Sequence, residues 1–329
     1  MKKTIALLGA GSWGTAVAIH LAQMGHQVLL WGHKPKHVAQ MQKDQANHQY
    51  LPGVAFPATL IPMENLNECV QQADEVIIAV PSHAFAALLA QLKQPLDGLS
   101  WLTKGVDPLS HQLLHQLVAK RFGDAFPVAV ISGPSFAKEV ARFLPTALTI
   151  ASNNASFQQK IHQLLHYGNV RAYLSDDLIG VQLCGAVKNI LAIACGISDG
   201  LGYGANAKAA LITRGLAEMT RLGLSFGARQ ETFLGLAGVG DLVLTCTDNQ
   251  SRNRRFGLLL GQGQSIDEAE QHIGQVVEGK YNAAQICALA QEQQIEMPIC
   301  EQINALLKKE CTPEEVVLQL MNRPAKEEY

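Results

Sequence analysis

The sequence predicts an α/β domain with a mostly parallel sheet, followed by an all-α domain. Three observations lead to this fold class. The first half alternates short aliphatic runs with stretches of helical period, as βαβ units do. A glycine-rich segment directly follows the first of these runs. After residue 175 the strand signal ends, so we expect one domain over 1–175 and a second over 176–329.

The predicted strands are short runs of aliphatic and β-branched residues: Thr4–Leu8, Val28–Trp31, Glu75–Val80, Ser100–Thr103, Val128–Ser132 and Thr146–Ala151. The helices predicted between them are Trp13–Met24, His83–Leu92, Leu109–Arg121 and Phe157–Leu165. An N-cap cluster, Ser175-Asp176-Asp177, introduces the second half. Its predicted helices are Asp177–Cys195, Ala207–Leu222, Ile266–Ile273, Asn282–Gln293, Pro298–Lys308 and Pro313–Met321.

Length and composition narrow the class of protein. At 329 residues the chain is long enough for two domains. Hydrophobic residues make up 48% and charged residues 16%, which excludes disorder over most of the length. The net charge of −2 provides no basic field, so we expect no nucleic-acid partner.

The cysteines and the apolar stretches indicate a cytoplasmic protein. The seven cysteines are dispersed, odd in number and without a C-x-x-C pair, as in a reducing compartment. The apolar run after Lys3 breaks at Gly9, too early for a signal peptide. The stretch Leu183–Ile197 is interrupted by Lys188 and is shorter than the roughly 18 residues of a membrane span. We therefore expect no transmembrane segment.

The segment Gly9-Ala10-Gly11-Ser12-Trp13-Gly14 lies between a predicted strand and a predicted helix. There Gly9 can turn the chain, Gly11 can let a pyrophosphate approach the backbone, and Gly14 can pack helix on strand. This context predicts a dinucleotide site in a Rossmann-like domain. The alternative is a tight glycine-rich turn without a ligand.

The end of the second strand bears on which dinucleotide binds. A site for NAD usually has Asp or Glu about 20 residues after the glycines, whereas a basic residue there accommodates a 2′-phosphate. Here Gly32-His33-Lys34 follows the strand, and the first carboxylate is Asp44. NADP(H) is favoured, unless His33 and Lys34 are merely solvated loop residues.

Two lysines are candidates for binding or catalysis. Lys188 stands beside Asn189 in a helix that is apolar on nearly every side, where a lysine is costly without a partner. The alternative is that its amine reaches solvent along its stem. Lys104 follows the Ser100–Thr103 strand, and strand C-termini are where ligands bind in open α/β sheets. By composition alone Lys104 could equally be a surface lysine.

The second half also contains an anion-binding pattern. Asp241 is a lone carboxylate in an apolar run and is expected to pair with a buried cation. Ser251 can cap a helix that begins at Arg252, and a helix N-terminus with Arg252 and Asn253 suits a phosphate. The alternative, a solvated basic face, is weakened because the run is short.

Two further patterns do not indicate a site. The pairs His111/His115 and His162/His166 have helical i, i+4 spacing but lack the Glu of H-E-x-x-H, so we expect no metal. The segment from Ser132 to Ser135 lacks the G-x-S-x-G elbow of hydrolases. Within it, Gly133 and Ser135 follow a strand at the same sheet edge as Lys104.

Taken together, these segments resemble the bacterial NAD(P)-dependent glycerol-3-phosphate dehydrogenase family over nearly the whole chain. The resemblance is strongest in the segment that runs from Gly185 through Lys188-Asn189 to Asn206, which is about twenty positions long. The other matching segments are Gly9–Gly14, Trp31–His33, Pro81–His83, Thr103–Gly105, Ile131–Glu139, Thr213–Glu218 and Gly240–Phe256.

The resemblance implies a cytoplasmic homodimer that interconverts dihydroxyacetone phosphate and sn-glycerol 3-phosphate for phospholipid synthesis, using NADP(H) and also NAD(H). It implies cofactor contacts from Ser12, Trp13, His33, Lys104, Ala137, Arg252, Val276 and Glu278. It implies substrate contacts from Lys104, Gly133, Ser135, Lys188, Asp241, Ser251, Arg252 and Asn253. Lys188 would be the catalytic cation and proton donor, positioned by Asp241.

Two alternatives remain at the level of sequence. A dinucleotide-sensing protein could share the fold without turnover, but would not need Lys188 and Asp241 in apolar settings. A β-hydroxyacid dehydrogenase would also use a helical Lys-Asn pair, but it would need residues that bind the carboxylate of its substrate.

Overall fold

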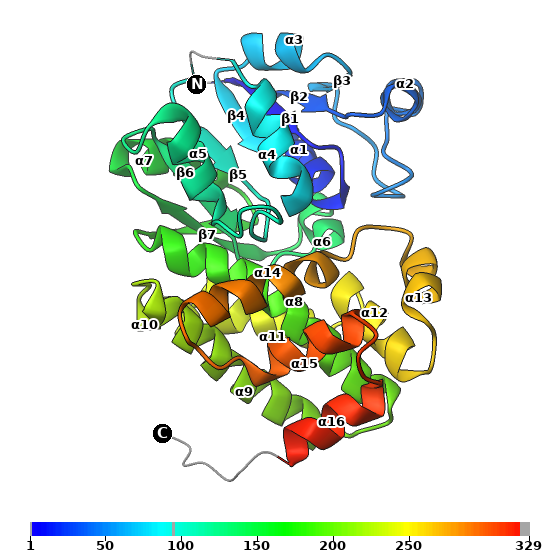
Figure 1. The fold of residues 1–329 in the computed structure, drawn as a ribbon. Helices are drawn as coiled ribbons and strands as arrows, with labels where there is room; N and C mark the ends of the chain where they lie inside the picture. Colours follow the sequence, from blue (N-terminus) through cyan, green and yellow to red (C-terminus); the bar gives the residue numbers. More distant parts are fainter. Residues whose placement is uncertain (1, 94–95, 323–329) are drawn as a thin grey trace. The chain divides into compact units, whose positions relative to one another are not determined.

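The computed structural model describes residues 2–93 and 96–322 and divides the chain into two compact units. One unit consists of 1–107 and 112–182, the other of 108–111 and 183–329. The first holds the sheet, drawn in blue to green in Figure 1, and the second holds helices, drawn in green to red. The last strand ends at Ser175, and the elements described after it are helices. The fold class predicted from the sequence is confirmed.

One eight-stranded sheet forms the first unit, in the order β3-β2-β1-β4-β5-β6-β7-β8. All neighbouring strands are parallel except β6 and β7. The strands are β1 (Thr4–Leu8), β2 (Gln27–Trp31), β3 (Leu60–Met63), β4 (Glu75–Ile78), β5 (Leu99–Trp101), β6 (Val128–Ser132), β7 (Thr146–Ser152) and β8 (Val170–Ser175). Strands β3 and β8, at the two edges, were not predicted.

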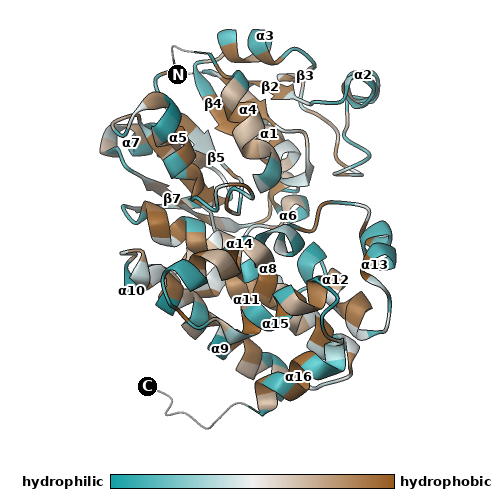
Figure 2. Cartoon of the chain, viewed as in Figure 1, coloured by the Kyte–Doolittle hydropathy of each residue, from teal (hydrophilic) through white to brown (hydrophobic). Residues whose placement is uncertain are grey.

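Helices pack against this sheet. They are α1 (Ser12–Gln23), α2 (Pro35–Asp44), α3 (Leu66–Gln71), α4 (Ser82–Gln91), α5 (Leu114–Phe122), α6 (Ala137–Ala141) and α7 (Ala155–Leu165). Residues 5–8 of β1 are buried, as expected for a strand covered on both faces. In Figure 2, β2 is largely brown and the peripheral α2 largely teal. The prediction of a helix from Leu109 was wrong at its start, because α5 begins only at Leu114.

The second unit is helical throughout its described part. It contains most of α8 (Leu178–Gly200), and α9 (Ala205–Ser225), α10 (Gln230–Leu234), the π-helical turn η1 (Leu236–Gly240), α11 (Asp241–Thr247), α12 (Arg252–Gly261), α13 (Ile266–Ile273), α14 (Glu278–Glu292), α15 (Pro298–Leu307) and α16 (Pro313–Met321). The Asp177 carboxylate caps α8 by accepting a hydrogen bond from the Gly180 N–H at 2.8 Å. The short helices α10 and α11 were not predicted.

Helix α8 is the core of the second unit. Its 23 residues make it long and apolar enough to match a membrane span by length and composition, and longer than the stretch noted in the sequence. However, 94% of its most apolar window is buried inside the protein. Among the described residues, this is the one helix that meets the criterion, and its burial identifies it as a core helix. None of the seven cysteines, all within the described residues, forms a disulfide.

Glycines bring the backbones of α8 and α12 into contact. A Cβ on Gly196 or Gly200 of α8 would overlap the carbonyl oxygens of Arg254 and Leu258 on α12. Conversely, a Cβ on Gly257 or Gly261 of α12 would overlap the carbonyl oxygens of Ile193 and Ile197 on α8. The two helices therefore approach more closely than side chains would allow.

This close contact predicts that Gly257→Ala is destabilising. The methyl group would meet backbone that cannot rotate away, so we expect a loss of about 3 kcal/mol in the free energy of unfolding. The expected loss exceeds the usual gain of about 1 kcal/mol from replacing a helical glycine by alanine. Chemical unfolding measures it, with Gly204→Ala as the control, because a Cβ there meets nothing within 4 Å. Equal stability of Gly257→Ala and the wild type would contradict the close packing.

Candidate active site

The glycine segment forms a cradle at the C-terminal edge of β1. Gly9 has a φ of 132°, which favours glycine, and a Cβ on Gly14 would overlap the Gly9 carbonyl oxygen. A Cβ on Gly11 would meet nothing within 4 Å, so this position is open. Gly11 is the N-cap of α1 and provides no capping side chain. These features fit a pyrophosphate bound at the helix N-terminus.

The residues next to the cradle are also suited to a ligand. The Ser12 hydroxyl donates to the Tyr50 carbonyl at 2.7 Å. The indole N–H of Trp13 is buried and has no hydrogen-bond partner among the described residues. A buried donor without a partner is costly, so a bound cofactor offering an acceptor would satisfy it. The cradle therefore fits a dinucleotide.

A residue that the sequence reasoning missed supports the cradle. The buried Asn47 side chain donates to the Ala10 carbonyl at 2.9 Å and to the Thr15 hydroxyl at 2.8 Å. It thereby ties the glycine loop to the first turn of α1. Its oxygen in turn hydrogen-bonds His37 and the Tyr50 N–H. An asparagine in a polar segment 33 positions after Gly14 gave no signal in the sequence.

His33 and Lys34 lie at the surface between β2 and α2, and Lys34 is the N-cap of α2. Partial burial lowers the pKa of His33, and the charges of Lys34 and His37 act in the same direction. His33 is therefore neutral at neutral pH unless an anion binds beside it. Lys34 is the residue of this pair that supplies charge there.

Three predicted residues meet where β5 and β6 end. The Lys104 ammonium donates to the Gly133 carbonyl at 3.2 Å, and the Ser135 hydroxyl donates to the same oxygen at 3.0 Å. Gly133 has a φ of 121°. Ala137 follows as the first residue of α6, a helix that packs on α1. These residues lie at the edge of the sheet where ligands bind in open α/β folds.

In the second unit, Lys188 of α8 is 5% exposed and Asp241 of α11 is 1% exposed. The two side chains form an ion pair, so the alternative in which Lys188 reaches solvent is wrong. The Lys188 ammonium also donates to the Thr245 hydroxyl at 2.9 Å, and that hydroxyl donates to the Asp241 carbonyl at 2.6 Å. The pair is thus buried, hydrogen-bonded and fixed between two helices.

The first turn of α12 is tied to α8 and α14 through amides. The Asn253 side chain donates to the Asn189 side-chain oxygen at 2.9 Å and accepts from the Gly279 N–H at 2.9 Å. The Ser251 hydroxyl caps α12 by accepting from the Arg254 N–H at 3.2 Å. Lys188 and Asn189 are neighbours on α8, so the amide chain connects the lysine to the capped turn.

The Arg252 guanidinium lies in the same turn and donates to the Gln275 side-chain oxygen at 3.3 Å. Burial lowers the pKa of Arg252, while the charge of Glu278 acts in the opposite direction. Val276 and Glu278 flank the start of α14 in the same stretch of chain. A desolvated guanidinium at a helix N-terminus is well suited to bind an anion.

The four histidines of the two pairs noted in the sequence lie in different surroundings. His111 lies before α5 with a φ of 55°, so the prediction that it shares a helix with His115 was wrong. His115 instead hydrogen-bonds Gln182 at 2.9 Å. The rings of His162 and His166 stack with centroids 4.5 Å apart. No group of three potential metal ligands occurs among the described residues.

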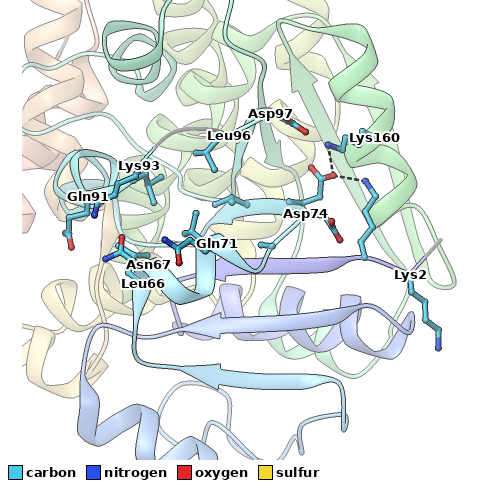
Figure 3. A pocket seen from close by; sticks show the side chains of 17 residues that line it. Lys2, Leu66, Asn67, Gln71, Asp74, Gln91, Lys93, Leu96, Asp97 and Lys160 are labelled. Carbon is cyan, nitrogen blue, oxygen red and sulfur yellow. Dashed lines mark hydrogen bonds and ion pairs between the residues drawn. The ribbon is translucent and has the colours of Figure 1, made fainter.

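A cavity of about 750 Å³ lies at the opposite, N-terminal edge of the sheet (Figure 3). Its lining includes the buried Glu75, whose Oε1 accepts from Lys3 at 2.6 Å and from Lys160 at 2.7 Å. None of the predicted site residues lines this cavity. Lys3 and Lys160 therefore neutralise a buried carboxylate, which explains their position without a ligand.

The chain combines a dinucleotide cradle with a buried lysine paired to a carboxylate. This combination defines the class of dinucleotide-dependent oxidoreductases. Residues 4–158 match the N-terminal half of the NAD-dependent glycerol-3-phosphate dehydrogenase family, and residues 177–318 match its C-terminal half. The chain belongs to this family.

Individual relatives agree with the family match. A glycerol-3-phosphate dehydrogenase [NAD(P)+] of Legionella pneumophila is 75% identical over 327 residues, covering 99% of each chain. One of Yersinia pestis is 53% identical, covering 99% of this chain and 97% of the relative. The crystal structure of glycerol-3-phosphate dehydrogenase from Coxiella burnetii is 51% identical, with a TM-score of 0.95 over 98% of this chain and 99% of that one. These similarities do not support the two alternatives left open by the sequence, a dinucleotide-sensing protein and a β-hydroxyacid dehydrogenase.

Proposed function

We propose that the chain uses NADP(H), and also NAD(H), to interconvert dihydroxyacetone phosphate and sn-glycerol 3-phosphate. The observation that carries this proposal is the Lys188–Asp241 pair. A buried ion pair adds little to the free energy of folding, whereas buried, paired ionisable groups are common at catalytic sites. The direct test is oxidation of NADPH with dihydroxyacetone phosphate, beside NADH and unphosphorylated dihydroxyacetone.

The proposed roles follow the chemistry of each group. When bound, the nicotinamide supplies or accepts the hydride at the carbon that carries the reacting oxygen. Lys188 stabilises the charge that develops on this oxygen and donates the proton to it. Asp241 and Thr245 orient the ammonium by accepting its hydrogen bonds. In the reverse direction Lys188 accepts the proton from the hydroxyl.

We assign the remaining candidates to two sets. The cofactor is held by the residues of the glycine cradle and by His33, Lys34, Lys104, Ala137, Arg252, Val276 and Glu278. The substrate is held by Lys104, Gly133, Ser135, Ser251, Arg252 and Asn253, and the guanidinium with the capped turn takes the phosphate. Residues 1–175 form the cofactor domain and 176–329 the substrate domain. The family resemblance supports a cytoplasmic homodimer that supplies glycerophospholipid synthesis.

Replacing the catalytic cation tests the first role. We expect Lys188→Ala to lower kcat by about 10² to 10⁴-fold, because acid–base catalysis contributes that much. The Kd of NADPH, measured by fluorescence titration, should stay near the wild-type value. Circular dichroism has to show that the variant is folded, since Asp241 loses its buried partner. Near-normal turnover would remove Lys188 from the mechanism.

The phosphate clamp is tested by comparing two substrates. We expect Arg252→Ala to lower kcat/KM for dihydroxyacetone phosphate by at least about tenfold, since a charge-assisted hydrogen bond contributes about 1.5 to 3 kcal/mol. Unphosphorylated dihydroxyacetone never makes this contact and should lose much less. Because Arg252 is also a cofactor candidate, the assay is run at saturating NADPH. Equal losses for the two substrates would place the phosphate elsewhere.

The lowered pKa of His33 predicts a pH-dependent cofactor preference. The ring is neutral at pH 8 and gains charge as the pH falls, so it can attract a 2′-phosphate only at acidic pH. We expect His33→Gln to weaken NADPH relative to NADH by about two- to fivefold at pH 5.5 and little at pH 8. Lys34→Gln should weaken NADPH at both pH values. The KM ratio of the two cofactors measures this, and an effect of His33→Gln that is equal at both pH values would rule the histidine charge out.

A further inference from the structure

Arg254 is a buried arginine in the second unit whose guanidinium the proposed reaction does not use. It is 8% exposed and lies two residues after Arg252 on α12, so the two side chains leave the helix in different directions. One terminal nitrogen donates to the Asn249 side chain and the other to Asp199, with which it forms an ion pair. Both terminal nitrogens are thus bonded to protein groups, while the buried Nε has no partner among the described residues.

The two partners of Arg254 lie in different segments, and one of them extends the network to a third. Asp199 is the next-to-last residue of α8, and its other carboxylate oxygen bonds Lys208 of α9 at 2.8 Å. Asn249 lies in the turn before α12, where the Ser251 N–H donates to the Asp248 carbonyl at 3.2 Å. Arg254 therefore ties the end of α8 to the turn that leads into Ser251 and Arg252.

The glycines between α8 and α12 explain why an additional connection between these helices is needed. Helices usually fix their relative position along the axis by side chains of one helix seated between those of the other. Gly196 and Gly200 face Gly257 and Gly261 across α8 and α12, and glycines provide no such side chains. The backbone contact sets the distance between the helices, but it resists sliding and rotation less than interlocking side chains do.

We propose that Arg254 is a positioning residue, which through Asp199 and Asn249 fixes α12 along α8 and thereby sets where Arg252 and Asn253 hold the substrate phosphate relative to Lys188. This inference rests on the proposed function. Because its terminal nitrogens bond Asn249 and Asp199, we assign Arg254 no contact with the substrate or the cofactor. A displacement of about 1 Å in a positioning group can lower the rate by up to about 10²-fold, so the tie matters for activity.

The test compares Asp199→Asn and Arg254→Lys, which keep most of the volume and part of the hydrogen bonding. At saturating NADPH we expect each to lower kcat/KM for dihydroxyacetone phosphate by about tenfold, while dihydroxyacetone, which has no phosphate to be misplaced, loses less than about twofold. Arg221→Gln is the control, since it removes a guanidinium of the same unit that bonds the Glu296 carbonyl, on a side of α9 unconnected to this network. Its substrate ratio should be that of the wild type.

A second readout does not depend on activity. If Arg254 positions the clamp, hydrogen exchange in both variants should accelerate in the segment 248–255 and stay normal in α15 and α16. A purely structural role would raise exchange throughout the helical unit and lower the rates for both substrates alike. That result, or an unchanged substrate ratio in folded variants, would overturn the inference. Failure of the wild type to reduce dihydroxyacetone phosphate would instead reject the proposed function, and the exchange pattern would still decide the role of Arg254.

Discussion

The backbone contact between α8 and α12 is the constraint on which the helical unit depends. Helix α8 carries Lys188 and Asn189, and α12 begins with the capped turn of Ser251, Arg252 and Asn253. Because four glycines let the two backbones meet, the Asn253 amide reaches Asn189 directly at 2.9 Å. Side chains in place of these glycines would separate the helices, and the amide chain to Gly279 could not close. Close packing here therefore determines the geometry of polar groups two turns away.

The same helix has to satisfy two opposing demands. Burial of α8 stabilises the unit because nearly all of its side chains are apolar, whereas Lys188 in its middle must be desolvated. Asp241 and Thr245 offset that cost through the ion pair and a hydrogen bond. A well-packed apolar residue would fill this position at least as stably. The lysine is better explained by the chemistry that we propose for it than by the stability of the fold.

How well each element could be predicted from the sequence follows from its burial. Strands buried on both faces are continuous aliphatic runs, so β1, β2 and β6 were found almost to the residue. The missed strands β3 and β8 are the two edges of the sheet. Strand β3 contains Pro62, which is tolerated at an edge but resembles a strand breaker. In β8 the exposed Arg171 and Tyr173 interrupt the apolar run, although this alternation is itself a strand signal.

The residues of the site also differ in how easily the sequence reveals them. A charged residue in an apolar segment stands out, whereas a polar residue in a polar segment does not. Lys188 and Asp241 stand in apolar segments, and that contrast makes both residues visible in the sequence and makes each the natural partner of the other. Asn47 and Arg254 lie among other polar residues and Asp199 lies at the end of α8, and the partners of these three side chains are 3 to 55 positions away in the chain. Only the folded geometry shows that Asn47 and Arg254 are buried and where all three side chains bond. The residues to which we assign the chemistry can thus be singled out from the sequence, whereas the residues that we propose to hold them in place become apparent only when distant segments are brought together.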